Sequence, residues 1–285
     1  MRAGLAALRA LIGGGQPPVW PLARIGTLPP GPVWAVGDIH GQSALLDRLE
    51  AAILRQDGGG RAPVRILYLG DYVDRGPDST GVLDRFTAPA PPGIERHFLC
   101  GNHEEMFAHF LSDPQPGAEW LQYGGRETLA SYGLFADRLG QRRHLAAAVE
   151  SLIPHSHRIF LEGLFDALRL PCPSLPGGEV VFVHAGIDPQ RALCDQPVRA
   201  LRWMREPFLS APRPAGPMVI HGHTPVDALR AGPTRINVDT GAGQGCALSA
   251  VRLGPQGQIA FMQVFPQGQV SSCPDRPGAQ RESAA

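Results

Sequence analysis

The glycine-rich loop at residues 70–76 and the strand before it constrain the fold more than any other stretch of the chain. Residues 65–69, Arg-Ile-Leu-Tyr-Leu, form a mainly apolar run of strand length, and the loop reads Gly-Asp-Tyr-Val-Asp-Arg-Gly. Open α/β sheets carry their chemistry beyond the carboxyl ends of their strands. We therefore expect Asp71, Asp74 and Arg75 to lie at such an edge, where a carboxylate can bridge two cations and a guanidinium can hold an oxyanion.

The same unit of strand, loop and helix recurs on both sides of this loop. Residues 33–36 are an apolar strand followed by Gly-Asp-Ile-His-Gly, and residues 96–100 run into Gly-Asn-His-Glu. Apolar residues at helical spacing follow each of the three loops. This alternation predicts an α/β fold in which neighbouring strands are parallel.

The first of the three loops places two candidate metal ligands two residues apart. In an extended segment Asp38 and His40 would project to one side, with Ile39 on the other. One carboxylate and one imidazole could therefore hold one cation. Ser43 is the expected N-cap of the helix that follows, and glycines from Gly58 onward end this helix.

The second half of the chain adds two more strands that end near histidines. Residues 114–164 have mainly helical spacing and are expected to form a cap over one side of the sheet. A hairpin then follows, whose second strand ends in His184, and a later strand runs into His-Gly-His-Thr-Pro, which contains His223. The last strands, within 236–264, are expected to form a meander that closes a second sheet.

Length and composition set the expected domain limits. The 285 residues contain no internal repeat and no long linker, which predicts one large domain over residues 31–265. Residues 1–30 are expected to be an N-terminal tail, amphipathic over its first twenty residues, and residues 266–285 a disordered tail. No apolar run approaches membrane-spanning length.

Charge and cysteine content restrict the partners and the compartment. A formal net charge of +0 argues against a general nucleic-acid binder and favours small phosphates or phosphoproteins. The 5 cysteines include no Cys-x-x-Cys pair, so neither a thiolate zinc site nor a disulfide framework is indicated, and a reducing cytoplasm is expected. Cys100 is expected to be a buried apolar side chain and not a nucleophile. The oligomeric state stays open.

Five apolar segments thus end in side chains that bind metals in proteins. These side chains are Asp38 with His40, Asp71, Asn102, His184 and His223. The mixture of carboxylate, amide oxygen and imidazole suits two divalent cations, manganese first, with iron, zinc, nickel or magnesium as alternatives. If Asp71 bridges the two ions, one ion is bound by Asp38, His40 and Asp71. The other ion is bound by Asp71, Asn102, His184 and His223.

Such a two-metal site would hydrolyse phosphate esters. Two cations lower the pKa of a bridging water, so hydroxide can attack phosphorus in line. His103 would protonate the leaving oxygen, and Asp74 would orient its ring. Arg75, Arg205 and Asn102 are the expected phosphate-binding residues.

Some polar and aromatic residues near these motifs have a structural alternative. Arg205 could pair with a neighbouring carboxylate instead of a phosphate. His221 lies two residues before His223 and is expected to support the ligands rather than bind metal. Trp120 and Tyr123 are expected to pack within the cap.

Taken together, the motifs resemble the signature of a known enzyme family. Gly-Asp-Ile-His-Gly at 37–41, Gly-Asp-Tyr-Val-Asp-Arg-Gly at 70–76 and Gly-Asn-His-Glu at 101–104 look like the three motifs of the phosphoprotein phosphatase (PPP) branch of calcineurin-like metallophosphoesterases. The later His-Ala-Gly, Gly-His-Thr-Pro and Asp-Thr-Gly are similar to those of bacterial and phage-type serine/threonine phosphatases. The resemblance covers residues 33–253. Cys100 stands where the eukaryotic enzymes usually place arginine.

The resemblance implies both a fold and a set of roles. The fold is an αββα sandwich, two mixed β-sheets flanked by helices, with a dinuclear site. The metal ligands, the pair of His103 and Asp74, and the phosphate ligand Arg75 carry over to this chain.

The resemblance also implies a bacterial phosphomonoester hydrolase, with serine/threonine protein phosphatase as the first expectation. The alternative is a symmetrical bis(5'-nucleosyl)-tetraphosphatase, which hydrolyses diadenosine tetraphosphate. Relatives of that kind typically carry aspartate where Glu104 stands. A third reading is a binding module that kept the fold and lost catalysis.

Overall fold

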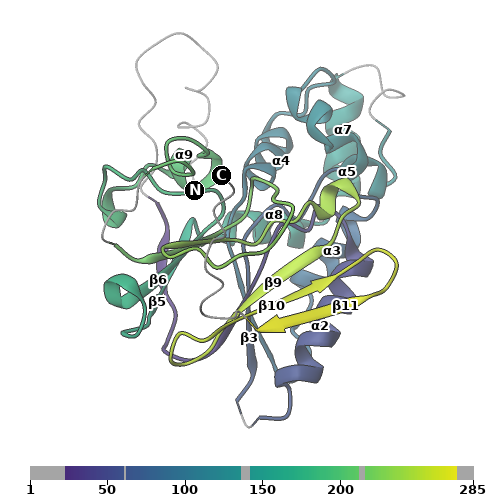
Figure 1. The fold of residues 1–285 in the computed structure, drawn as a ribbon. Coiled ribbons are helices and arrows are strands. Elements are labelled where there is room, and N and C mark those ends of the chain that lie inside the picture. The colour runs from purple at the N-terminus through teal and green to yellow at the C-terminus, as the bar shows by residue number, and fades with distance from the viewer. Residues whose placement is uncertain (1–22, 61, 136–141, 212–215, 275–285) are drawn as a thin grey trace, which may run out of the picture.

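The computed structural model describes residues 23–60, 62–135, 142–211 and 216–274 (Figure 1). The strands are β1 (Ile25–Thr27), β2 (Val33–Val36), β3 (Val64–Tyr68), β4 (Ile94–Phe98), β5 (Ala167–Pro171), β6 (Glu179–Val183), β7 (Met218–His221), β8 (Arg235–Asn237), β9 (Leu248–Leu253), β10 (Ile259–Val264) and β11 (Val270–Pro274). The α-helices are α2 (Ser43–Asp57), α3 (Ser79–Thr87), α4 (Asn102–Ser112), α5 (Gly125–Ser131), α7 (Arg142–Leu152), α8 (His155–Gly163) and α9 (Val198–Trp203). A 3₁₀ helix, η1, spans Glu119–Tyr123.

The strands form two mixed sheets, as the sequence predicts. The six-stranded sheet has the order β11-β10-β9-β2-β3-β4, and the five-stranded sheet has the order β1-β5-β6-β7-β8. Strands β2, β3 and β4 are parallel neighbours, which confirms the repeated unit of strand, loop and helix. The expected hairpin is also present, since β5 pairs antiparallel with β6.

Side chains that alternate between the two faces of each central strand form two separate apolar layers. In β2, Trp34 and Val36 pack into the core under the helices, whereas Val33 and Ala35 pack between the two sheets. A third cluster covers the outer face of the five-stranded sheet and includes Leu201 of α9. The order of layers is therefore helix, sheet, sheet, helix, which confirms the αββα sandwich.

Helices also fill the segment expected to be a cap. Within the described residues of 114–164 (114–135 and 142–164) lie four helices, namely η1, α5, α7 and α8. Of these, η1, α5 and α8 pack onto α3 and α4, on the helical side of the six-stranded sheet (Figure 1). Across the described ranges, no helix combines the length and the apolar character that crossing a membrane requires.

The expected domain limits of 31 and 265 are too narrow. Strand β1, Ile25–Thr27, pairs parallel with β5, and β11, Val270–Pro274, pairs antiparallel with β10. Both strands are short or polar, so their sequences carry little strand signal, and pairing with an existing sheet edge defines them. Residues 1–22 of the expected N-terminal tail, which include the amphipathic segment, and residues 275–285 of the expected C-terminal tail lie outside the described residues.

The expected meander of the last strands holds for β9 and β10, which pair antiparallel, but it is wrong for β8. Strand β8 belongs to the five-stranded sheet, parallel to β7, while β9 lies in the six-stranded sheet, antiparallel to β2. The reason is burial. Five of the six residues of β9 are buried, and a strand of this kind needs a central place with both faces covered.

The N-cap expected at Ser43 is also wrong. Ser43 is the first residue of α2, and Gln42 occupies the cap position without a side-chain cap bond. The Ser43 hydroxyl instead donates to Asp78, 2.5 Å away, whose carboxylate caps α3 by accepting from the backbone N–H of Gly81 at 2.9 Å. The two helices after β2 and β3 are thereby joined at their amino ends.

Candidate metal centre

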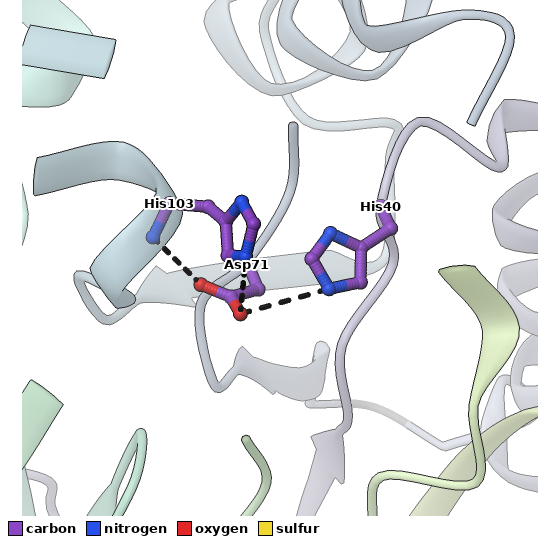
Figure 2. Close-up of side chains that lie close together, drawn as sticks. All are labelled: His40, Asp71 and His103. Atoms are coloured by element: carbon purple, nitrogen blue, oxygen red, sulfur yellow. Dashed lines mark hydrogen bonds and ion pairs between the residues drawn. The ribbon is translucent and has the colours of Figure 1, made fainter. Parts of the chain in front are cut away.

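The loops after β2, β3, β4, β6 and β7 meet at one edge of the sandwich, around Asp71. Its Oδ2 lies 3.6 Å from Nε2 of His40 and 3.9 Å from Nε2 of His103 (Figure 2). The same oxygen lies 3.4 Å from Nε2 of His184. One buried carboxylate thus faces three imidazoles from three different loops.

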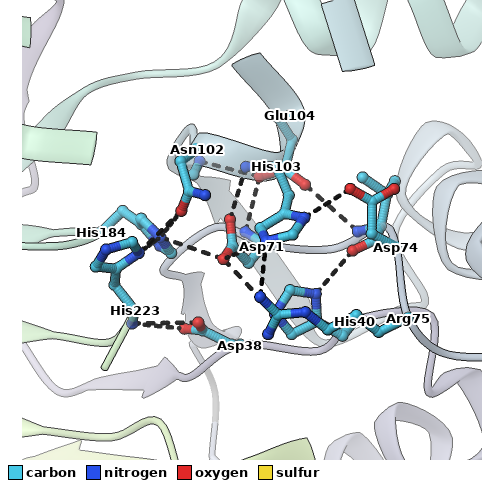
Figure 3. Close-up of polar contacts among 12 residues, drawn as sticks. Asp38, His40, Asp71, Asp74, Arg75, Asn102, His103, Glu104, His184 and His223 are labelled. Atoms are coloured by element: carbon cyan, nitrogen blue, oxygen red, sulfur yellow. Dashed lines mark hydrogen bonds and ion pairs between the residues drawn. The ribbon is translucent and has the colours of Figure 1, made fainter. Parts of the chain in front are cut away.

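A second group of donor atoms lies on the other side of Asp71. Oδ1 of Asn102 is 3.0 Å from Nε2 of His184 and 2.9 Å from Nδ1 of His223 (Figure 3). The two ring nitrogens are 3.2 Å apart. The sequence therefore predicts correctly that these three residues and Asp71 come together.

Hydrogen bonds outside the cluster fix the tautomers of two rings. Nδ1 of His40 lies 2.9 Å from the carbonyl of Val73, and Nδ1 of His184 lies 3.0 Å from the carbonyl of Leu69. A carbonyl oxygen only accepts, so each Nδ1 donates and each Nε2 points at the cluster. This orientation is typical of histidines that bind metals.

Electrostatics indicate that the cluster attracts cations. Burial lowers the pKa of His184, but the charges of Asp71, Asp38 and Glu104 and the hydrogen bond to Asp71 together outweigh burial and raise this pKa to about 9. Burial, together with the charge of Asp239, raises the pKa of the Asp38 carboxyl well above its usual range. Asp239 is itself raised to a pKa of about 6, first by burial. Buried carboxylates that crowd one another in this way fit a site built for cations.

Asp38 lies at the same edge, where it contacts the backbone of His223. Its carboxylate oxygens accept the backbone N–H of His223 at 3.1 and 3.2 Å. Asp239 is a neighbour that the candidate list lacked. Its signal in the sequence is the Asp-Thr-Gly motif, in which the carboxylate also accepts the backbone N–H of Gly241 at 2.9 Å.

The backbone at the cluster is left-handed, not extended. Five non-glycine residues have positive φ in the part of the chain that the structure describes: His40 (47°), Asp71 (53°), Asp74 (75°), Arg75 (65°) and His223 (68°). All five are candidate site residues, and each such conformation costs energy that the surroundings must offset. The extended geometry expected between Asp38 and His40 is therefore wrong, although both side chains reach the site.

Glu104 holds the strained loop after β3. Its carboxylate accepts the backbone N–H groups of Asp71 and Tyr72, each at 2.7 Å, and that of Gly101 at 2.9 Å. Glu104 is buried, with 1% of its surface exposed. Its oxygens are occupied by the backbone, so this carboxylate shapes the site without reaching a substrate.

His103 and Asp74 form the expected pair. Nδ1 of His103 lies 2.6 Å from Oδ2 of Asp74. Asp74 also accepts from Nε1 of Trp120 at 2.7 Å and from the hydroxyl of Thr128 at 2.6 Å. Burial lowers the pKa of His103, but the charges of Asp71 and Asp74 outweigh burial and raise it. Trp120 was expected only to pack in the cap, and the sequence gives no signal for its bond to Asp74.

The two candidate arginines are both exposed, but they approach the cluster differently. Arg75 donates through Nη1 to Nε2 of His40 at 2.9 Å and through Nη2 to Nε2 of His103 at 3.0 Å. Arg205 is exposed, and its charge, after burial and the charge of His184, helps to lower the pKa of His223 to about 3. Arg205 therefore lies close enough to the cluster to act on it.

Comparisons with known proteins agree with this geometry. The family model for calcineurin-like phosphoesterase matches residues 31–253, a range that contains every candidate ligand. A PP2A-like serine/threonine-protein phosphatase of Candida albicans, PPG1, is 30% identical over 176 residues, which is 61% of this chain and 33% of that protein. The chain thus aligns with only about a third of the length of the first curated phosphatases that it matches.

Other matches extend over nearly the whole length of the matched protein. The asymmetrical bis(5'-nucleosyl)-tetraphosphatase PrpE of Geobacillus thermodenitrificans is 26% identical over 242 residues, covering 76% of this chain and 88% of that protein. A solved structure of a candidate diadenosine tetraphosphatase has a TM-score of 0.56 at 26% identity and covers 90% of this chain and 100% of that chain. A cold-active protein-tyrosine phosphatase of Shewanella, with a TM-score of 0.53 at 15% identity, covers 91% of this chain and 87% of that chain, and it shares the fold.

Proposed function

Since this chain belongs to the calcineurin-like phosphoesterase family, we propose that it hydrolyses phosphate esters or anhydrides with two bound divalent cations. The observation that carries this proposal is the position of Asp71 between two groups of metal-binding side chains, with the pair of His103 and Asp74 beside them. An acid, an orienting carboxylate and a bridging ligand are the parts that such a reaction needs.

Each cation would have its own set of ligands. One set is Asp38, His40 and Asp71, and the other is Asp71, Asn102, His184 and His223. Imidazole and carboxylate donors suit manganese, and they also accept iron, zinc, nickel or magnesium. When bound, the two cations supply an activated water and offset the charge of the phosphate.

The residues of the chain would handle the phosphate and the proton. Arg75 presents two forked donors at the cluster, which match two phosphate oxygens, and Arg205 adds positive charge nearby. The amide group of Asn102 would give a further contact to the phosphate. As the new P–O bond forms and the old one breaks, His103 gives a proton to the leaving oxygen. Asp74 holds the ring and stabilises its charged form.

We propose a dinucleoside tetraphosphate as the substrate, with a phosphoserine or phosphothreonine protein as the second candidate. Two matches at 26% identity that span nearly the whole of the matched protein carry names of tetraphosphatases, whereas the protein-tyrosine phosphatase of similar coverage is only 15% identical. The serine/threonine phosphatase matches share a region of about a third of those proteins. Glu104, which seemed to favour the protein phosphatases, bonds only to backbone N–H groups within the site and so does not select the substrate.

A direct comparison of the two substrates tests this order. The protein, loaded with manganese, is incubated in parallel with diadenosine tetraphosphate and with a phosphothreonine peptide. We expect the dinucleotide to be cleaved with the higher kcat/KM. Two ADP molecules would show symmetrical cleavage, and ATP with AMP would show asymmetrical cleavage. Release of phosphate from the peptide alone would establish the second candidate. If neither substrate were hydrolysed, the result would favour a binding module without catalytic activity.

We also propose that the protein works in a reducing compartment such as the cytoplasm. Four cysteines, Cys100, Cys172, Cys194 and Cys246, are free in the structure, two of them exposed to solvent. Exposed thiols persist where thiol reductants are abundant.

A further inference from the structure

A cavity of about 540 Å³ opens beside the metal centre. Arg75 forms one wall, and η1, α5 and the turn between them form the rest, with Gln122, Tyr123, Arg126 and Glu127 among the lining side chains. Sites for small molecules commonly measure about 300–1,000 Å³, so the cavity is large enough for a nucleotide. The reaction as described above uses Arg75 but no other residue of this cavity.

The cavity is fixed in position relative to the reacting phosphate. The backbone N–H of Arg75 donates to the carbonyl of Gly124 at 3.2 Å, which joins the cavity wall to the loop after β3. Gly124 has φ of 107°, and a Cβ there would lie 2.4 Å from the backbone nitrogen of Arg75. Only glycine permits this approach. A phosphate held by Arg75 therefore has the cavity as its neighbour.

The lining side chains match the parts of a nucleotide. Tyr123 is 49% exposed, and its hydroxyl donates to Glu119 at 2.9 Å, which holds the ring in one place. A fixed, exposed aromatic ring is a stacking surface for a base. Gln122 and Glu127 are also exposed and offer an amide and a carboxylate for base edges or ribose hydroxyls, while Arg126 adds a positive charge to the wall.

We infer that this cavity is the subsite for a nucleotide portion of the substrate, with the base stacked on Tyr123 and the adjoining phosphates running past Arg75. This inference rests on the proposed hydrolysis at the metal centre and names the part of the substrate that reaches the cavity. A phosphopeptide would present a flexible chain at the same place, with no requirement for the tyrosine ring.

Product inhibition separates the nucleotide subsite from the phosphate site. The full chain, loaded with manganese, hydrolyses a small chromogenic phosphoester while either ADP or inorganic phosphate is added as inhibitor. Tyr123→Ala should raise the inhibition constant of ADP about tenfold, because one stacked base is lost, and should change that of inorganic phosphate less than twofold. Tyr123→Phe keeps the ring but loses the bond to Glu119, so the ADP constant should rise less than in Tyr123→Ala, and the phosphate constant should stay at the wild-type value.

Ile159→Ala is the matched control, because Ile159 is an exposed apolar residue of α8 outside this cavity. An unchanged ADP constant in Tyr123→Ala, or an equal rise for phosphate, would overturn the subsite. If wild-type protein hydrolyses no phosphoester, the proposed function fails, and calorimetric titration with ADP still tests the subsite. In that titration, equal affinity of wild type and Tyr123→Ala would overturn it.

Discussion

The imidazole of His103 has two neighbours that set its direction. Asp74 lies 2.6 Å from Nδ1, and Arg75 donates to Nε2 from 3.0 Å. Because arginine only donates, Nε2 carries the lone pair in this arrangement and Nδ1–H points at Asp74. The ring can therefore take up one proton at Nε2, the atom that faces the metal cluster, and deliver it to a leaving group there.

His103→Asn tests this role. We expect turnover to fall about 100-fold or more for alkyl phosphates, whose leaving oxygen needs a proton, and to fall less for an aryl phosphate. Bound metal should stay at the wild-type level because His103 belongs to neither proposed ligand set. Kinetics on both substrates together with metal analysis check this. If the variant lost a metal ion, His103 would be a metal ligand. If the variant kept wild-type turnover, His103 would have no catalytic role.

Trp120→Phe tests how Asp74 is held. The indole N–H lowers the pKa of Asp74 against the effect of burial, which raises it. Without this bond the pKa of Asp74 rises further, so the carboxylate protonates at a higher pH and His103 loses its charged partner. The acidic limb of the pH profile of kcat should therefore move to higher pH, with a fall in kcat of about tenfold.

Trp203→Phe is the matched control for that substitution. Its indole N–H donates to Glu105 at the surface, 2.8 Å away. We expect its pH profile to coincide with that of the wild type. If Trp120→Phe also gave the wild-type profile, Trp120 would contribute only by packing in the cap, as the sequence suggested.

At the scale of elements, one buried carboxylate connects four of them. Glu50 of α2 accepts from the hydroxyl of Tyr68 in β3, from Nε of Arg85 in α3 at 2.9 Å and from Nη2 of Arg96 in β4 at 3.0 Å. Its side chain is 2% exposed. Removing the charge leaves two guanidinium groups without their main partner, one of them buried.

Glu50→Gln should lower the free energy of unfolding by about 3 kcal/mol. Asp47→Asn is the control, since Asp47 pairs with Arg85 but its side chain is 60% exposed. The control should cost less than about 1 kcal/mol. Chemical denaturation of both variants gives the comparison, and equal losses would contradict the burial argument.

The sequence predicts those elements whose own residues carry enough signal to identify them as helices or strands. β2 and β3 are apolar enough to be recognised, and the polar motif after each marks where it ends. β1 and β11 could not be predicted, because edge pairing with β5 and β10 creates them. In the site, residue types and order were sufficient to name candidate ligands that the structure brings together. The left-handed φ of His40 and the bonds from Trp120 and Thr128 to Asp74 depend on tertiary contacts that no local pattern encodes.

At the scale of the whole molecule, the cluster lies where the two sheets share an edge. Asp38, Asp71 and Asn102 follow strands of the six-stranded sheet, whereas His184 and His223 follow strands of the five-stranded sheet. A cation held by Asp71 and His184 would therefore join both sheets. Ligand binding to the native state alone stabilises it by mass action.

Metal binding should accordingly raise the melting temperature of the entire chain. We expect manganese added to chelator-treated protein to raise Tm by several degrees in a single transition, since a stabilisation of about 1 kcal/mol shifts Tm by about 2–4 °C in a protein of this size. His223→Ala should reduce the rise, because the five-stranded sheet then loses one ligand. If manganese left the Tm unchanged, the proposal that a cation links the two sheets would be contradicted.

Metal content measured together with hydrolysis of a chromogenic phosphomonoester, with and without manganese, tests the central claim most directly. The two-metal account predicts about two ions per chain and activity that rises as they bind. It also predicts that Asp71→Asn, which removes the bridging carboxylate, loses both ions and most of the activity. Protein that binds no metal and stays inert under all conditions, or an Asp71→Asn variant with wild-type metal content and turnover, would contradict the account.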